Sequence, residues 1–93
     1  MHYKMWGIYS PLLERWVRDT GSKIEAYIDN NQFDIDIEYF SEDDPRVSLY
    51  GFTHLPVFVA VKYDQPFRRI AGKWEWPRYE EWCKGLNWKL DEV

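Results

Sequence analysis

Five consecutive apolar residues, Val57 to Val61, constrain the fold of this chain more than any other stretch. The side chains of a strand alternate between two faces, so every position can be apolar only where other parts of the chain cover both faces. We therefore predict a central β-strand at 57–61, in a sheet with helices on both sides. Because the chain has 93 residues, we expect residues 1–93 to form a single domain.

The segments around this run predict the remaining strands and helices. The expected elements are, in chain order, a strand at 2–8, a helix from Ser10-Pro11 to Asn30-Asn31, a strand at 33–39, a helix at 45–50, a strand at 57–61, a strand at 67–71 and a helix that begins at Pro77. Their order is β-α-β-α-β-β-α, which predicts an α/β fold with a four-stranded mixed sheet. The short turn at 63–66 predicts that the last two strands form an antiparallel hairpin.

Apolar residues at spacings of three and four, from Leu13 to Ile28, predict the first helix. Gly21 interrupts the pattern and destabilises a helix by about 1 kcal/mol relative to Ala. The segment is therefore compatible with one continuous helix or with two helices. At the start of this segment the Ser10 hydroxyl can accept a hydrogen bond from an unpaired amide. Pro11 then occupies the first helical position, where no N–H is needed.

Apolar and acidic residues alternate at 33–39, which predicts a strand with one buried face. Its acidic residues, Asp34, Asp36 and Glu38, share the other face. We interpret them as the solvated face of an edge strand, where charge discourages unwanted pairing. Cation binding is the alternative interpretation.

The composition argues against nucleic acid and membrane as partners. The net charge is −4, whereas nucleic-acid binding depends on Lys and Arg neutralising phosphates. No apolar run approaches the roughly 20 residues that span a bilayer, and Met1 to Gly7 do not resemble the start of a secretory signal. The one cysteine, Cys83, cannot form an internal disulfide, as expected in a reducing compartment, so we predict a cytoplasmic location.

Several short motifs that contain proline or glycine mark the second half of the chain. Asp44-Pro45 opens the short helix that ends at Tyr50-Gly51, Leu55-Pro56 precedes the central strand, and Ile70-Ala71-Gly72 closes the strand after it. These motifs resemble those of the thioredoxin-like superfamily, and the resemblance extends from Ile35 to Leu86. It implies a thioredoxin-like fold and a cis peptide bond at Leu55-Pro56 before the third strand, since that proline is cis in the family.

The resemblance is weaker at the place where the family carries its reactive cysteines. Ser10-Pro11-Leu12-Leu13 stands where glutaredoxins have Cys-Pro-x-Cys, so the proline is kept and both cysteines are absent. Thiol–disulfide exchange needs a thiolate, and a serine hydroxyl forms no mixed disulfide. We expect Cys83 to be a buried, inert residue of the last helix. The chain therefore has no candidate catalytic residue, and we predict that it is redox-inactive.

A binding groove remains possible without cysteines. In active relatives the backbone of the residue before the cis-proline pairs with an extended substrate, a form of strand addition. The resemblance implies a groove for a ligand or partner formed by Ser10, Pro11, His54, Leu55, Pro56 and Gly72. Two of these residues have a second interpretation, Ser10 as a helix cap and His54 as an exposed loop histidine. No further histidine or carboxylate lies near His54 in the sequence to form a metal site or triad.

Tryptophans near the end of the chain form a second candidate surface. Trp74, Trp76 and Trp88 cannot all be buried in so small a domain. Exposed tryptophans often mark interfaces, because they combine a large area with a polar group. The alternative is that they cover the open end of the sheet and pack on one another.

The leading hypothesis is a redox-inactive thioredoxin-fold module that binds a protein or peptide partner, and its interface could also support a homodimer. The alternative is a glutaredoxin- or glutathione-transferase-like oxidoreductase, or a glutathione-binding protein, since Tyr9-Ser10-Pro11 resembles the start of glutathione-transferase domains. The missing cysteines oppose it, and so does Lys73, because glutaredoxins tend to carry an acidic residue there. We expect no cofactor, with glutathione as the one candidate. A structural accessory of a larger assembly is a third possibility.

Overall fold

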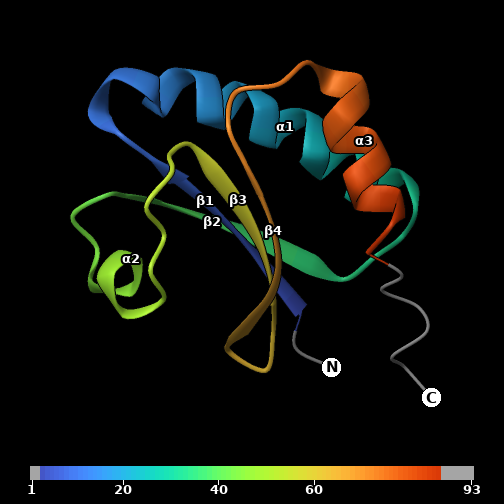
Figure 1. Cartoon of the computed structure of the whole chain (residues 1–93). Helices are drawn as coiled ribbons and strands as arrows, with labels where there is room; N and C mark the ends of the chain where they lie inside the picture. Colours follow the sequence, from blue (N-terminus) through green and yellow to red (C-terminus); the bar gives the residue numbers. More distant parts are fainter. Residues whose placement is uncertain (1–2, 87–93) are drawn as a thin grey trace.

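The computed structural model describes residues 3–86 and contains the predicted order of elements (Figure 1). The elements are β1 (Tyr3–Tyr9), the 3₁₀ turn η1 (Pro11–Leu13), α1 (Glu14–Asn30), β2 (Ile35–Ser41), α2 (Pro45–Leu49), β3 (Val57–Lys62), β4 (Gln65–Ala71) and α3 (Trp76–Lys84). Within residues 3–86, no helix combines the length and the apolar character that crossing a membrane requires.

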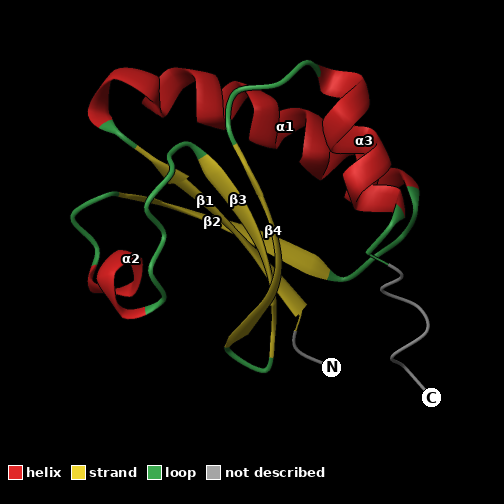
Figure 2. Cartoon of the chain, viewed as in Figure 1, coloured by secondary structure: helices red, strands yellow, loops and turns green. Residues whose placement is uncertain are grey.

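The four strands form one mixed sheet in the order β2-β1-β3-β4 (Figure 2). Strand β1 is parallel to β2 and antiparallel to β3, and β3 is antiparallel to β4. The apolar run from Val57 to Val61 lies in the inner strand β3, where no residue of the run is more than 1% exposed. The predicted central strand, the hairpin and the edge position of β2 are therefore confirmed.

The turn of the hairpin is shorter than the sequence predicts. Tyr63 and Asp64 alone connect β3 to β4, and both adopt positive φ values, 51° and 63°. Strand β4 consequently begins at Gln65 and includes Pro66. A proline is tolerated there because β4 is an edge strand, and the register shift beside it, between Ala60 and Val61, accommodates the irregular pairing.

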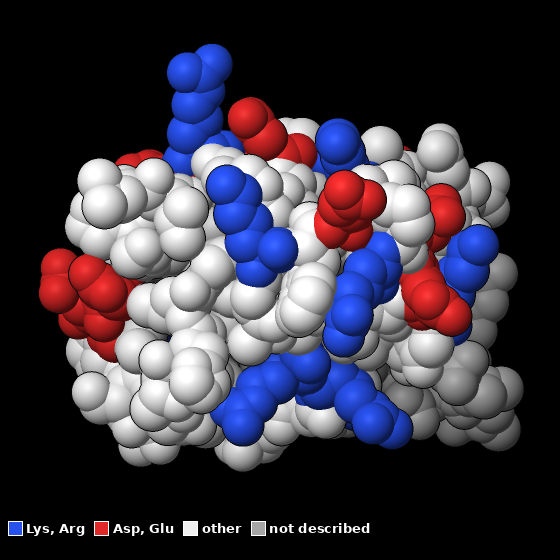
Figure 3. Space-filling view, turned by 45° about the horizontal axis from the view of Figure 1, so that its top comes forward, with Lys and Arg blue, Asp and Glu red and all other residues white. Residues whose placement is uncertain are grey.

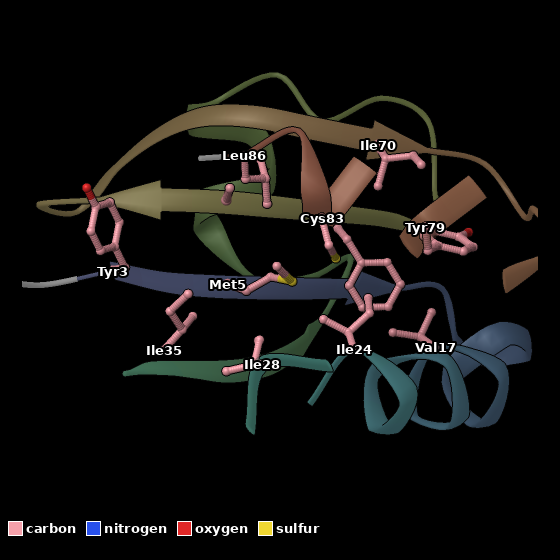
Figure 4. Packing of buried hydrophobic residues seen from close by; sticks show 12 residues of the cluster. Tyr3, Met5, Val17, Ile24, Ile28, Ile35, Ile70, Tyr79, Cys83 and Leu86 are labelled. Carbon is pink, nitrogen blue, oxygen red and sulfur yellow. The ribbon is translucent and has the colours of Figure 1, made fainter. Parts of the chain in front are cut away.

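Helices cover both faces of the sheet, with α1 and α3 on one face and α2 on the other (Figure 1). Phe58 and Ala60 of β3 belong to the core under α1 and α3, which Figure 4 shows from close by. Its buried members are Tyr3, Met5, Val17, Ile24, Ile28, Ile35, Phe58, Ala60, Ile70, Tyr79, Cys83 and Leu86. The second core lies under α2 and contains Trp6, Ile8, Phe40, Phe52, Val57, Val59 and Val61.

Helix α1 is continuous through Gly21, so one helix is correct and two are not. The glycine is buried against the ring of Tyr39 from β2, and a Cβ added there would meet the Tyr39 hydroxyl and ring carbons. The Tyr39 hydroxyl donates a hydrogen bond to Glu25 of α1 at 3.1 Å. Gly21 thus lets the tyrosine ring pack directly on the helix backbone, and this contact outweighs the low helix propensity of glycine.

Arg46 of α2 holds the short helix against the sheet. Its guanidinium lies 3.7 Å from the ring centroid of Phe40 and 5.0 Å from that of Trp6. It also donates hydrogen bonds to Glu38 at 2.9 and 3.1 Å and to Asp44 at 2.9 and 3.0 Å. Hydrogen bonding to Arg46 lowers the pKa of both carboxyl groups. The acidic residues predicted to form a solvated face, Asp34, Asp36 and Glu38, are all exposed, as expected, and Glu38 also pairs with this arginine.

Replacing Gly21 with alanine tests the contact between α1 and β2. Overpacking against Tyr39 costs about 1–3 kcal/mol, which exceeds the gain in helix propensity of about 1 kcal/mol. We expect Gly21→Ala to lower the free energy of unfolding in urea, and exposed Ser22→Ala to leave it within about 0.5 kcal/mol. In a Tyr39→Leu background the alanine should become neutral or stabilising. An equal loss in both backgrounds would contradict this account.

The ion pairs of Arg46 predict a dependence of stability on pH. Because the folded-state pKa values of Glu38 and Asp44 lie below the unfolded ones, the stability they provide is present above the unfolded pKa values. It is lost as the pH falls from about 5 to about 3. We expect Arg46→Met to reduce the change in the free energy of unfolding over this pH range by about 0.5–1 kcal/mol. The control Arg15→Met, on exposed α1 surface, should keep the wild-type slope.

Candidate functional site

The predicted groove residues from three strands meet at one end of the sheet. The register pairs Ile8 at the end of β1 with Val57 at the start of β3, and Val57 with Ala71 at the end of β4. The chain leaves β1, enters β3 and leaves β4 at this end, which lies at the upper left of Figure 1. We call the surface formed here by Ser10, Pro11, Leu12, Leu55, Pro56 and Gly72 the tip.

Two segments of the tip are joined by a backbone hydrogen bond. The Leu55–Pro56 peptide bond is cis, the isomer that the family resemblance implies. The Gly72 N–H donates to the Pro56 carbonyl at 2.8 Å, so the loop before β3 is tied to the end of β4. Gly72 has φ +106°, a conformation that favours glycine. Leu55 is half-buried and Pro56 is buried.

The third segment of the tip is the turn before α1. Ser10 has extended backbone angles before the 3₁₀ turn, but its side chain makes no capping hydrogen bond, so the predicted cap is wrong. Its backbone carbonyl instead accepts a bond from the Leu13 N–H at 2.9 Å. The 3₁₀ turn thus closes through the main chain, and the structure does not use the hydroxyl as a cap.

Leu12 is the feature of the tip that the sequence did not indicate. Its side chain is 96% exposed, the highest value among the exposed large hydrophobic residues of the described chain. The signal was present, because Leu12 lies outside the apolar face that Leu13, Trp16 and Val17 begin. An isolated exposed leucine is ordinary on a protein surface, but this one lies beside Pro11, in the segment where the family resemblance implies the position of the glutaredoxin motif.

The single thiol is not part of the tip. Cys83 is 2% exposed and packs into the core under α1 and α3, where Figure 4 places it near Tyr79 and Met5. Burial raises its pKa to about 12. The expectation of a buried cysteine is confirmed, and no thiol among residues 3–86 faces the tip.

His54 is exposed, and it lies on the face of the sheet that α2 covers. It lines a hollow of about 80 Å³ together with Phe52 and Val57, which belong to the core under α2, and with Arg69 of β4. Among the described residues, no group of three or more His, Cys, Asp or Glu side chains could hold a metal ion.

The predicted aromatic surface forms a hollow of about 450 Å³ between α1 and the segment that joins β4 to α3. We call it the tryptophan hollow; its lining residues are Trp16, Thr20, Lys23, Lys73, Trp74, Glu75, Trp76 and Tyr79. Trp74 is 42% exposed, whereas Trp76 is half-buried and packs against the core. Trp88 lies outside the described residues. Trp16 was expected only as a member of the helical core face.

Hydrogen bonds hold Trp74 in place above Gly72. The indole N–H donates to the Ala71 carbonyl at 2.8 Å, and the backbone N–H of Trp74 donates to the Tyr79 hydroxyl at 3.2 Å. That hydroxyl donates in turn to the Gly72 carbonyl at 2.7 Å. A Cβ at Gly72 would come within 2.9 Å of the indole nitrogen. Gly72 therefore belongs to the tip, and the Trp74 ring also packs against its backbone.

Comparison with known proteins gives structural matches and no sequence matches. No protein-family model and no curated protein matches the chain. Thioredoxin O2 from Arabidopsis thaliana in the oxidized state superposes with a TM-score of 0.68 at 10% identity, covering 90% of this chain and 74% of that one.

Two further thioredoxins superpose with TM-scores of 0.61. Thioredoxin 1 from the thermophilic eubacterium Thermosipho africanus is 17% identical, with 90% of this chain and 98% of that chain covered. Fasciola hepatica thioredoxin is 16% identical, with 90% and 80% covered. These likenesses, together with the sheet order and the helices on both faces, show that the chain has a thioredoxin-like fold.

Proposed function

We propose that this chain is a redox-inactive thioredoxin-fold module that binds a protein or peptide partner through its tip. The observation that carries the proposal is Leu12, a nearly fully exposed leucine at the place where glutaredoxins have their reactive motif. A cytoplasmic location belongs to the proposal, since a lone cysteine fits a reducing compartment. A second copy of the chain is one partner that the test below distinguishes.

The state of the thiol supports the absence of redox chemistry. Burial raises the pKa of the Cys83 thiol to about 12, so the folded chain disfavours the reactive thiolate. The same side chain is buried in the core, where a disulfide partner cannot reach it without unfolding. Dithiol exchange also needs a second cysteine, and the chain has one.

The geometry of the tip supports peptide binding. Burying the Leu12 side chain in a complex would contribute about 1.5–3 kcal/mol, and Pro11 restricts the turn that presents it. The loop at Leu55–Pro56 is tied to Gly72 through a hydrogen bond, so this part of the tip is already organised. A peptide that adds its backbone next to this loop would gain affinity at a low ordering cost.

Selection from a random peptide library on the immobilised chain tests the proposal. We expect the selected peptides to bind Leu12→Ser at least about tenfold more weakly than wild type, which corresponds to losing the burial of one leucine. Leu49→Ser is the matched control, because Leu49 of α2 is also a highly exposed leucine, at 72%. Its affinity for the same peptides should equal that of the wild type.

Two results would overturn the proposal. One is a selection that retains no peptide above background, and the other is equal weakening by both serine variants. Sedimentation of the free chain separates self-association from peptide binding, because a homodimer through the tip would dissociate in Leu12→Ser and persist in Leu49→Ser.

Thiol chemistry provides an independent prediction. We expect Cys83 to react with iodoacetamide at pH 8 far more slowly in the folded chain than in urea, where it should react at the rate of a free thiol, because the folded site is buried and disfavours the thiolate. Reduction of hydroxyethyl disulfide in the presence of glutathione should show no turnover. Turnover that disappears in Ser10→Ala would instead support the glutathione-dependent alternative.

A further inference from the structure

We infer that the tryptophan hollow binds an acidic segment of the partner peptide that carries an aromatic side chain. This inference rests on the proposed peptide-binding function and assigns a chemistry to the partner. Four observations support it: the aromatic lining, the fixed position of Trp74, the charge of the lining and the short chain distance between the hollow and the tip.

The lining provides aromatic surface on opposite sides. Trp16 comes from α1, Trp74 comes from the segment that leads into α3, and Trp76 is the first residue of α3, so the hollow joins parts of the chain that are far apart in sequence. Trp16 also contacts the buried Tyr79 ring, with centroids 5.9 Å apart. A volume of about 450 Å³ accommodates a planar side chain together with its neighbours along a peptide.

Trp74 forms a fixed platform in the free protein. Its indole N–H is bonded to the Ala71 carbonyl, and the Arg78 guanidinium lies 3.9 Å from its ring centroid. Glycine at position 72 allows the indole to approach the backbone below it. Because Arg78 covers the face of the indole and Gly72 lies below it, a ligand ring contacts the exposed part of the indole edge. An indole that is held before binding loses little side-chain entropy, and an edge-to-face contact contributes to affinity beyond the area buried.

The charge of the lining residues favours a negatively charged ligand. Two exposed lysines, Lys23 and Lys73, and one glutamate, Glu75, line the hollow, so it is positive in a chain whose net charge is −4. The Lys73 ammonium lies 5.7 Å from the centroid of the Trp16 ring. A cationic ligand would have to displace this lysine and meet a second one. A carboxylate gains both lysines as partners and helps to orient the peptide.

Gly72 of the tip directly precedes Lys73 and Trp74 of the hollow in the chain. This residue bonds to Pro56 with its N–H and to the Tyr79 hydroxyl with its carbonyl, and Trp74 follows two positions later. Two residues span at most about 7 Å, so a peptide that crosses the tip reaches the hollow within a few residues. Figure 3 shows charged side chains of both signs on the face that contains α1 and α3, separated by uncharged surface. A short acidic peptide fits this surface better than a nucleic acid, which needs a larger basic area.

Two matched tetrapeptides test the inference. The probes are acetyl-Asp-Phe-Glu-Phe-amide and its neutral counterpart acetyl-Asn-Phe-Gln-Phe-amide, titrated while tryptophan fluorescence is recorded. Phenylalanine does not interfere with tryptophan excitation. We expect the acidic peptide to bind more tightly, and each of Lys23→Gln and Lys73→Gln to weaken it roughly two- to fivefold. Trp74→Ala should weaken it roughly two- to tenfold.

The control is Lys84→Gln, which removes an exposed lysine of α3 that does not line the hollow and should leave the affinity unchanged. Circular dichroism of each variant shows whether it folds, and the lysine variants provide a test if Trp74→Ala does not fold. Equal affinity for the two tetrapeptides, or equal weakening by Lys84→Gln, would overturn the inference.

Failure of this inference can be told apart from failure of the proposed function. Library-selected peptides that require Leu12 but ignore Lys23, Lys73 and Trp74 would overturn the role of the hollow and leave the tip as the binding surface. Selection of no peptide at all would overturn the proposed function. Enrichment of Asp and Glu beside Phe, Tyr or Trp, lost on Lys23→Gln/Lys73→Gln, would support both.

Discussion

The burial of β3 on both faces is the constraint on which the rest of the structure depends. Its side chains supply both cores, Phe58 and Ala60 under α1 and α3, and Val57, Val59 and Val61 under α2. A strand of this kind must lie inside the sheet, which leaves β2 and β4 as the edges. The register of β3 with both neighbours then brings the end of β1, the start of β3 and the end of β4 together. The tip exists because of that register.

The layers on either side of the sheet are held in different ways. On one face α1 approaches β2 closely enough for the Tyr39 ring to lie on Gly21, and α3 adds buried Tyr79 and Cys83. On the other face α2 has five residues and no buried side chain of its own, so a charged side chain holds this helix against the sheet. Arg46 covers two aromatic rings of the core and pairs with carboxylates of β2 and of the helix start. A short helix thereby shields a face that it is too small to cover with apolar groups.

The same architecture places the thiol away from the surface that we propose for binding. In this chain the sulfur lies in the core, with a raised pKa, while the end of the sheet presents leucine, proline and an indole ring. Gly72 is the residue that links these features, because it ties the loop before β3 to β4 and lets Trp74 lie over the main chain. A surface organised by backbone hydrogen bonds can retain its shape when reactive side chains are absent. This is the physical basis for proposing a binding module.

The sequence by itself determined the order of elements, the central strand, the hairpin, the edge strand and the buried cysteine, because each follows from local periodicity or from a residue type with one ordinary environment. It also indicated the residues of the tip other than Leu12, through the Ser10-Pro11 segment and the motifs around Pro56 and Gly72. The tertiary structure alone decided that α1 runs unbroken through Gly21, that Ser10 does not cap it, and that Trp16 and Lys23 face Trp74 across a hollow. These outcomes depend on which side chains from distant segments come within contact, and local patterns do not carry that information.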